Sequence, residues 1–312
     1  MSTGSGGGGS RIAVEPKTGR YESLEAAVVA AGGEVAVPTE ADALVWADAH
    51  ADPADLAATI AKGPGIRWVA LPFAGIEPYV PHLDHDRTWT CARGVYARPV
   101  AEHVLTSALA GLRGFVGYAR ATTWSAPVGE NLLDGDVVIF GAGGITEELL
   151  KLLAPFECTT TVVRRRPDPL PGADRTVAMA DRLDVLGGAD LVVLALALTP
   201  ENHGFFGAAE LAAMASHAWL VNVARGGHVD NDALLAATTE GRIGGAVLDV
   251  TEPEPLPDDH PLWAVPNVLI TPHIGNTPEM GVPLLAAHIE ANVAAFIAGE
   301  PLAGVVDVDA GY

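Results

Sequence analysis

The sequence predicts an α/β protein built from two doubly wound parallel-sheet domains. Short apolar runs such as Val137-Val138-Ile139-Phe140 show no alternation, which indicates strands buried on both faces of a parallel sheet. Segments with apolar residues at helical spacing separate most of these runs, as in β-α-β connections. The length of 312 residues suits about two domains.

The first hundred residues supply the elements of one compact unit. Strands are predicted at residues 11–15, 34–37, 43–46, 67–71 and 88–92, and helices at residues 21–31 and 53–61. A longer helical pattern covers residues 99–118 and opens with Pro99, a residue favoured in a first helical turn.

A second and larger set of elements begins with the buried strand at residues 137–140. Further strands are predicted at residues 159–163, 176–178, 191–196, 219–223, 246–250 and 268–270. The clearest helices between them cover residues 208–215 and 230–240. A last helix is predicted at residues 283–298, and the tail after it is expected to return to the first domain.

The composition excludes several classes of protein. With 18 Lys and Arg against 39 Asp and Glu, the net charge of −21 argues against nucleic-acid or anionic-membrane binding. No apolar run is predicted to span a membrane, and residues 1–10 are expected to form a disordered tail rather than a signal peptide. Cys91 and Cys158 are widely spaced, which favours a reduced cytoplasmic protein without a metal site.

A glycine turn follows the strand at residues 137–140. Gly141-Ala142-Gly143 leads into a helical pattern, so backbone N–H groups can converge on a pyrophosphate. An ordinary tight turn is the alternative, since a pair of glycines is common. Thr146 replaces the third glycine of the G-x-G-x-x-G pattern, so we expect a Thr146→Gly change to bring the helix closer and tighten cofactor binding.

Three arginines follow the strand at residues 159–163. Arg164, Arg165 and Arg166 stand where an NAD-binding domain carries an acidic residue for the ribose 2′-hydroxyl. An arginine at this place suits the 2′-phosphate of NADP instead. The alternative is a solvated strand end.

Three further polar residues lie just beyond predicted strands of the same domain. Arg225 can hold a carboxylate bidentately, or it can form a structural ion pair. A proline-rich loop carries Glu252 and Glu254, and His273 follows the strand at residues 268–270. Each could be structural alone, but their shared position at carboxyl ends of strands favours a ligand site.

The motifs GAGGIT, LALTPENHG, VNVARGG, LDVTEPEPLPDDHPLW and TPHIGNT occur in this order. With these motifs and the spacing from Arg225 to Glu254, the sequence resembles the D-isomer-specific 2-hydroxyacid dehydrogenase family over nearly its whole length. The chain departs from that family at Thr146, where a glycine is usual, and at Arg164, where an aspartate is usual.

The resemblance implies a flavodoxin-like substrate-binding domain and a Rossmann-type cofactor domain. Residues 11–98 and 277–312 would form the first, and residues 99–276 the second, with hinges at residues 98–101 and 275–278. It also implies a homodimer formed through the cofactor domain, with residues 99–118 as the interface helix.

The resemblance also implies roles for individual residues. Arg225, Glu254 and His273 would be catalytic, and Arg225 would bind the substrate carboxylate together with the N–H groups of Ala74, Gly75 and Ile76. The cofactor would contact Gly141, Gly143, Gly144, Ile145, Arg164, Arg165, Val223, Ala224 and Asp249. Four aromatic residues would shape the pocket, with core packing as the alternative for each: Phe73, Tyr79, Tyr96 and Trp263.

The implied function is reversible hydride transfer between NADPH, with NAD as a second cofactor, and C2 of a small 2-oxo acid. His273 would exchange the proton, and Glu254 would stabilise its imidazolium form. A phosphite-type dehydrogenase and a corepressor-like protein that senses the cofactor without turnover are the alternatives. Glu254 argues against the formate-oxidising relatives, which carry glutamine at this position.

Overall fold

The computed structural model describes residues 10–48 and 50–311. The chain divides into two compact units: unit 1 comprises Met1–Tyr96 and Thr277–Tyr312, and unit 2 comprises Ala97–Asn276. Unit 2 begins two residues before the predicted boundary because its first helix starts at Ala97. The predicted tail lies outside the described residues, except for Ser10.

Unit 1 contains a parallel five-stranded sheet in the order β2-β1-β3-β4-β5, the flavodoxin-like arrangement. Its strands are β1 (Arg11–Glu15), β2 (Glu34–Val35), β3 (Ala43–Trp46), β4 (Trp68–Ala70) and β5 (Thr88–Thr90). Its helices are α1 (Tyr21–Ala30), α2 (Pro53–Lys62) and α8 (Pro278–Ala298).

Helices cover both faces of this sheet. The Trp68 ring of β4 lies 5.1 Å from the Phe296 ring of α8, and α8 packs against α1. The next residue of β4, Val69, belongs instead to the core that includes Leu56 and Ile60 of α2. Successive strand residues point to opposite faces of the sheet. Since helices cover both faces, Trp68 and Val69 are both buried, which explains the unbroken apolar run in β4.

Helix α8 differs from its prediction. It begins at Pro278, five residues before the predicted start, and contains Pro283 in its interior. A proline is favoured in the first turn, and Pro278 rather than Pro283 takes that position. The helix is long and apolar enough to satisfy the length and composition criteria of a membrane span, but Leu285 and Ile289 are buried within unit 1.

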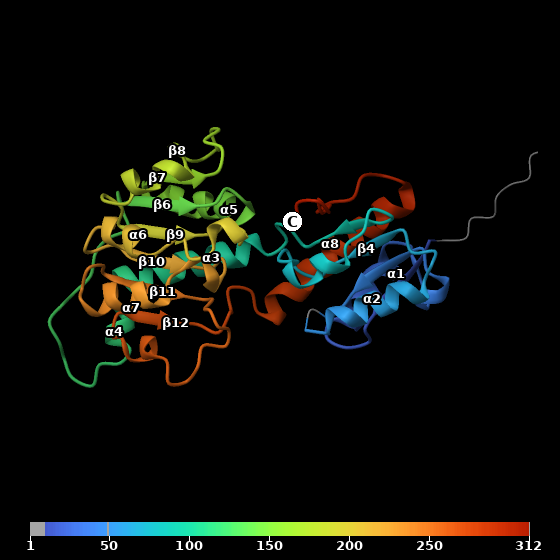
Figure 1. Ribbon diagram of the computed structural model, residues 1–312, viewed down its shortest axis with the longest axis horizontal. Helices are drawn as coiled ribbons and strands as arrows, with labels where there is room; N and C mark the ends of the chain where they lie inside the picture. Colours follow the sequence, from blue (N-terminus) through green and yellow to red (C-terminus); the bar gives the residue numbers. More distant parts are fainter. Residues whose placement is uncertain (1–9, 49, 312) are drawn as a thin grey trace, which may run out of the picture. The chain divides into compact units, whose positions relative to one another are not determined.

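Unit 2 contains an all-parallel sheet in the order β12-β11-β10-β9-β6-β7-β8 (Figure 1). The chain order reverses between β6 and β9, where ligands bind in sheets of this kind. The strands are β6 (Asp136–Phe140), β7 (Thr159–Arg164), β8 (Arg175–Ala178), β9 (Leu191–Leu194), β10 (Trp219–Asn222), β11 (Gly245–Leu248) and β12 (Val268–Ile270). The two parallel sheets confirm the predicted fold class.

The helices of unit 2 cover both faces of the sheet. Ile139 of β6 packs in the core that includes α3 and α5, whereas Phe140 packs in the core that includes α6 and α7. These helices are α3 (Ala97–Leu112), α5 (Gly144–Leu153), α6 (Ala208–Ala213) and α7 (Asn231–Thr239).

The prediction of one helix at residues 99–118 was wrong. The segment forms α3, which also contains the predicted hinge at residues 98–101, and a short helix α4 (Phe115–Tyr118). Gly114 separates them with a φ of +69°, a left-handed conformation that glycine adopts without steric cost and that ends a helix.

Candidate active site

The glycine turn after β6 lies at the point where the chain order of the sheet reverses. Gly141 has a φ of +105°, and a Cβ there would lie 2.3 Å from the carbonyl oxygen of Ala195, beyond the end of β9. Only glycine therefore permits this approach. Gly143 precedes α5, and no atom lies within 4 Å of its ideal Cβ position, so the turn faces open space. Together with the first N–H groups of α5, at Gly144 and Ile145, it fits a pyrophosphate.

Thr146 contacts the glycine turn directly. Its side chain is buried, and its Oγ1 donates a 2.9 Å hydrogen bond to the carbonyl oxygen of Gly141. The threonine therefore ties α5 to the turn, whereas the sequence suggested that it would hold the helix away.

Arg164 ends β7 beside the glycine turn. The N–H of Gly141 donates to the carbonyl oxygen of Val163 at 2.8 Å, so Arg164 is the next residue along the neighbouring strand. Its Nη1 donates to the carbonyl oxygen of Asp168 at 3.4 Å. The side chains of Arg165 and Arg166 are exposed. This strand end thus carries positive charge next to the pyrophosphate cradle.

His273 and Glu254 form a close pair in unit 2. Nδ1 of His273 lies 2.7 Å from Oε1 of Glu254, and the two side chains are 52% and 42% exposed. A carboxylate at Nδ1 assigns a proton to that nitrogen and orients the ring. Nε2 can then exchange a proton with a ligand.

The backbone of His273 has an uncommon conformation. Its φ is +54°, in the left-handed region that residues with side chains seldom adopt. Its N–H donates to the carbonyl oxygens of Asp249, at 2.9 Å, and Thr271, at 3.0 Å. These bonds hold the histidine at a sharp bend beyond β12.

The buried carboxylate of Asp249 fastens the loop on either side of His273. Oδ1 accepts hydrogen bonds from the hydroxyl of Thr271, at 2.6 Å, and the N–H of Ile274, at 2.8 Å. Oδ2 accepts from the N–H of Gly275 at 2.9 Å. Within unit 2, Asp249 therefore positions the histidine loop, and its contact with a cofactor stays a prediction.

Arg225 lies just beyond β10 in a turn held by its own carbonyl group. That oxygen accepts from Nδ2 of Asn222 at 2.9 Å and lies 3.1 Å from Nδ1 of the buried His228. Nη1 of Arg225 donates to the carbonyl oxygen of Ala224 at 2.7 Å, and the side chain is partly exposed. Val223 and Ala224, predicted to line the cofactor, are buried at the start of this turn.

Gly226 brings the Arg225 turn against the loop that carries Glu254. A Cβ at Gly226 would lie 1.9 Å from the carbonyl carbon of Thr251, so the two backbones touch. Glu252 points to another histidine: its Oε2 lies 2.9 Å from Nε2 of His203. Sequence reasoning did not single out Gly226, although two glycines directly after an arginine are a signal of close backbone approach.

The predicted carboxylate-binding residues Ala74, Gly75 and Ile76 lie in unit 1, in the loop after β4. Within the described residues their N–H groups donate no hydrogen bond.

Phe73 contacts Tyr96 edge-on, with ring centroids 6.0 Å apart. The Tyr96 hydroxyl donates to the carbonyl oxygen of Pro72 at 2.7 Å, and burial raises the pKa of Tyr96 to about 12. Tyr79 is buried in the core of unit 1, in agreement with the alternative of core packing.

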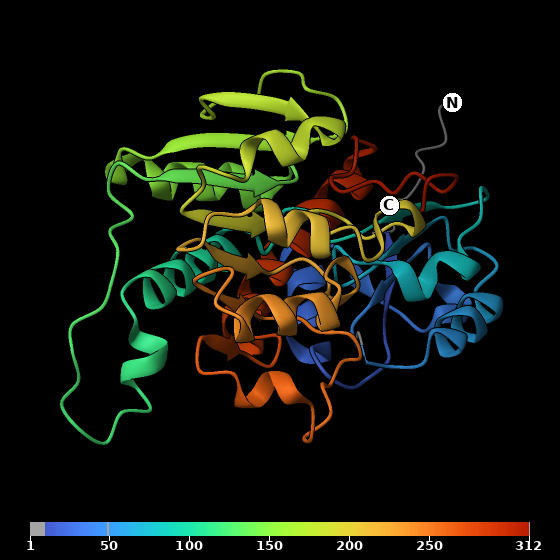
Figure 2. The same ribbon diagram turned by 60° about the vertical axis from the view of Figure 1, so that its left-hand side comes forward.

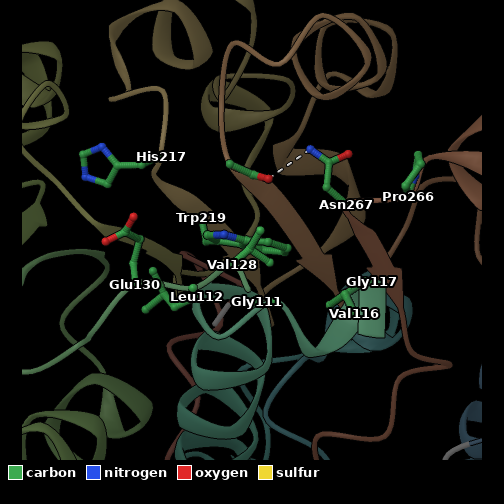
Figure 3. A pocket seen from close by; sticks show the side chains of 13 residues that line it. Gly111, Leu112, Val116, Gly117, Val128, Glu130, His217, Trp219, Pro266 and Asn267 are labelled. Atoms are coloured by element: carbon green, nitrogen blue, oxygen red, sulfur yellow. Dashed lines mark hydrogen bonds between the residues drawn. The ribbon is translucent and has the colours of Figure 1, made fainter. Parts of the chain in front are cut away.

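A cavity of about 380 Å³ in unit 2 lies apart from these groups (Figure 3). Trp219, His217 and Asn267 line it together with α3 and α4, and none of the predicted site residues does so.

Trp263, predicted to shape the substrate pocket, is 44% exposed, and its Nε1 donates to the carbonyl oxygen of Pro257. In the described parts of the chain, no group of three His, Cys, Asp or Glu could hold a metal ion.

The Rossmann-type sheet, the glycine cradle and the carboxylate-bound histidine define a nicotinamide-dependent dehydrogenase. Residues 104–275 match the model of the D-isomer specific 2-hydroxyacid dehydrogenase family, NAD binding domain. The chain belongs to this family.

Two relatives support this assignment. A protein of Corynebacterium melassecola, described as an uncharacterized protein in the proB 3′ region, is 42% identical over 79% of this chain and 84% of its own length. Glyoxylate/hydroxypyruvate reductase A of Serratia proteamaculans is 38% identical over 56% of this chain, and the match spans only 55% of that enzyme.

Two solved structures resemble the chain over nearly its whole length. A family member from Xanthobacter autotrophicus Py2, in complex with NADPH and MES, has a TM-score of 0.81 and 28% identity, covering 98% of this chain and 100% of that one. An NADPH-dependent glyoxylate/hydroxypyruvate reductase from Sinorhizobium meliloti, with NADP and sulfate, has a TM-score of 0.80 and 28% identity, covering 97% and 100%. This protein is therefore an NAD(P)-dependent oxidoreductase of hydroxy acids.

Proposed function

We propose that the protein reversibly reduces a small 2-oxo acid to its D-2-hydroxy acid, with NADPH as the preferred cofactor. The 2.7 Å pair of His273 and Glu254 carries this proposal, because it supplies an oriented proton donor. The names of the Serratia and Sinorhizobium relatives support a substrate of the glyoxylate or hydroxypyruvate type.

When bound, the cofactor would supply the hydride that reduces C2 of the substrate. Arg225 grips the carboxylate with its planar guanidinium and polarises the neighbouring carbonyl group. Nε2 of His273 donates a proton to the carbonyl oxygen, and Glu254 stabilises the positive charge of the imidazolium before that transfer. In the oxidation, His273 accepts the proton at the same nitrogen.

The residues after β6 and β7 fit the phosphate groups of NADP. Gly141, Gly143 and the start of α5 take the pyrophosphate, while Arg164 and Arg165 take the 2′-phosphate. The Xanthobacter structure contains NADPH and the Sinorhizobium structure contains NADP, which supports this preference. NAD is the second cofactor.

Unit 1 is proposed to be the substrate-binding domain. Its loop after β4 presents the N–H groups of Ala74, Gly75 and Ile76, which suit a carboxylate because they have no other acceptor in the described residues. Both cysteines are free thiols, which supports a cytoplasmic location.

A homodimer formed through unit 2 is also proposed. The segment between α4 and β6 follows the outside of unit 2 (Figure 2), and Trp124 in it is fully exposed. Phe115 and Val128 nearby are more than 60% exposed. Val128 also borders the cavity of Figure 3, which an apolar side chain of a second copy could fill. Replacing Trp124 by Ser should then shift the mass measured by light scattering toward the monomer.

Steady-state turnover with a panel of 2-oxo acids, with NADPH and NADH in parallel, tests the enzymatic function. Reduction of at least one small 2-oxo acid, faster with NADPH, is the expected result. Cofactor binding without turnover of any panel member would favour the corepressor-like alternative. Oxidation of phosphite alone would favour the phosphite-type alternative.

A further inference from the structure

Arg20 in unit 1 lies beside the loop that is proposed to bind the substrate. It follows the loop after β1 and directly precedes α1. Its guanidinium carbon lies 4.6 Å from the centre of the Phe73 ring, and Phe73 directly precedes Ala74. Because β1 and β4 are parallel, the loops that follow them share the carboxyl edge of the sheet.

The guanidinium of Arg20 forms no ion pair within the described residues, although its charge is one of the smaller causes that lower the pKa of Asp48. Nη1 of Arg20 is buried and makes no hydrogen bond in the described residues. A buried N–H without an acceptor is destabilising, so Nη1 of Arg20 marks a cost that the fold of unit 1 does not offset.

The surrounding loop is organised without help from Arg20. Asp48 fixes it, because Oδ2 accepts from the hydroxyl of Thr18 at 2.8 Å and Oδ1 accepts from the N–H of His50 at 2.9 Å. A cavity of about 210 Å³ is lined by residues 17–23. Arg20 is therefore held beside space for a small group, while the loop has its own structural bonds.

We propose that Arg20 binds a second carboxylate of the substrate, so that the enzyme prefers 2-oxo dicarboxylic acids to 2-oxo monocarboxylic acids. The inference rests on the proposed function, in which the N–H groups of residues 74–76 in unit 1 bind the first carboxylate. Stacking on Phe73 fixes the plane of the guanidinium, and because only Nη1 is buried without a partner, Nε and Nη2 are the pair of donors for a planar, bidentate acceptor. A neutral terminal group cannot use this charge.

Substrate pairs of equal chain length test the inference. The kcat/KM values of oxaloacetate and 2-oxobutanoate, and of 2-oxoglutarate and 2-oxopentanoate, are measured in the parent, in Arg20→Gln and in Lys62→Gln. Lys62 is the matched control, since it is an exposed cation of unit 1 at the end of α2 and does not line this cavity. The stability of each variant is checked by thermal unfolding.

The parent should favour the dicarboxylate of at least one pair, and Arg20→Gln should lower that preference about ten- to a hundredfold, the range of one charge-assisted hydrogen bond. Lys62→Gln should keep it. Equal loss for both members of each pair would overturn the inference, because Arg20 would then act on the shared carboxylate. Turnover of the monocarboxylates with a kcat/KM equal to or above that of the dicarboxylates would also overturn the inference, and it would still support the proposed function.

A binding measurement keeps the inference testable even without turnover. With NADP⁺ present, 2-oxoglutarate should raise the unfolding temperature of the parent more than 2-oxopentanoate does. Arg20→Gln should abolish this difference. An equal rise with both ligands in the parent would count against the second carboxylate site, whatever the fate of the catalytic proposal.

Discussion

Nδ1 of His273 lies 2.7 Å from Oε1 of Glu254. Two residues earlier in the same loop, Glu252 pairs with His203 instead. Glu254→Gln should therefore lower kcat for 2-oxo acid reduction about tenfold or more, since the amide cannot stabilise the imidazolium charge. Glu252→Gln, the matched control, should stay within about twofold of the parent. Equal losses in steady-state kinetics would remove the special role of Glu254.

His273→Asn should remove proton transfer. General acid–base catalysis contributes about 10²–10⁴-fold, and kcat should fall by a factor in this range. The dissociation constant of NADPH, measured by fluorescence titration, should stay near that of the parent because the cradle lies after β6. Near-normal turnover in this variant would end the proposed role of His273.

Arg164→Asp should reverse the cofactor preference. A carboxylate at the end of β7 would repel the 2′-phosphate and accept a hydrogen bond from a free 2′-hydroxyl. The ratio of kcat/KM for NADPH to that for NADH should fall about tenfold to a hundredfold, the range of one charge-assisted contact. Arg166→Asp changes the charge two residues further along and serves as the control. A ratio that is the same in the parent and Arg164→Asp would sink the NADP assignment.

Thr146→Gly should weaken cofactor binding, the reverse of what the glycine pattern suggested. The change deletes a buried side chain and its hydrogen bond to Gly141, which loosens the contact of α5 with the glycine turn. Thr146→Ser retains the hydroxyl and should bind NADPH nearly as well as the parent. Calorimetric titration checks this order, and tighter binding by the glycine variant would contradict it.

The buried His228 should make stability depend on pH. Burial lowers its pKa from the ordinary value of 6.5, so the unfolded chain binds the proton more readily than the folded chain. The free energy of unfolding should therefore be highest above about pH 6.5 and fall as the pH drops below that value. His228→Gln should flatten this slope in urea unfolding between pH 7 and 5. His85→Gln, at an exposed site, should leave the slope as it is.

The local features of this chain follow from its sequence. Unbroken apolar runs predict buried parallel strands, because such a run is a property of consecutive residues. The strands β1, β3 and β12 have the predicted bounds. The glycine turn after β6 and the polar residues beyond strand ends were visible for the same reason. Gly114 was a local signal too, but the apolar periodicity across it concealed the break between α3 and α4.

The tertiary structure alone decided how these features meet. The residues by themselves left Glu252 and Glu254 as equal candidates for pairing with a histidine. The path of the loop decides that Glu254 pairs with His273 and Glu252 with His203. Likewise, Thr146 bonds to Gly141, and Gly226 touches Thr251, 25 residues further along the chain. Such contacts depend on the register of packed strands and helices, because side chains distant in sequence meet only when the sheet fixes both of their positions. The sequence pattern indicates whether a segment is a strand or a helix, but it does not specify how the packed elements are aligned with one another.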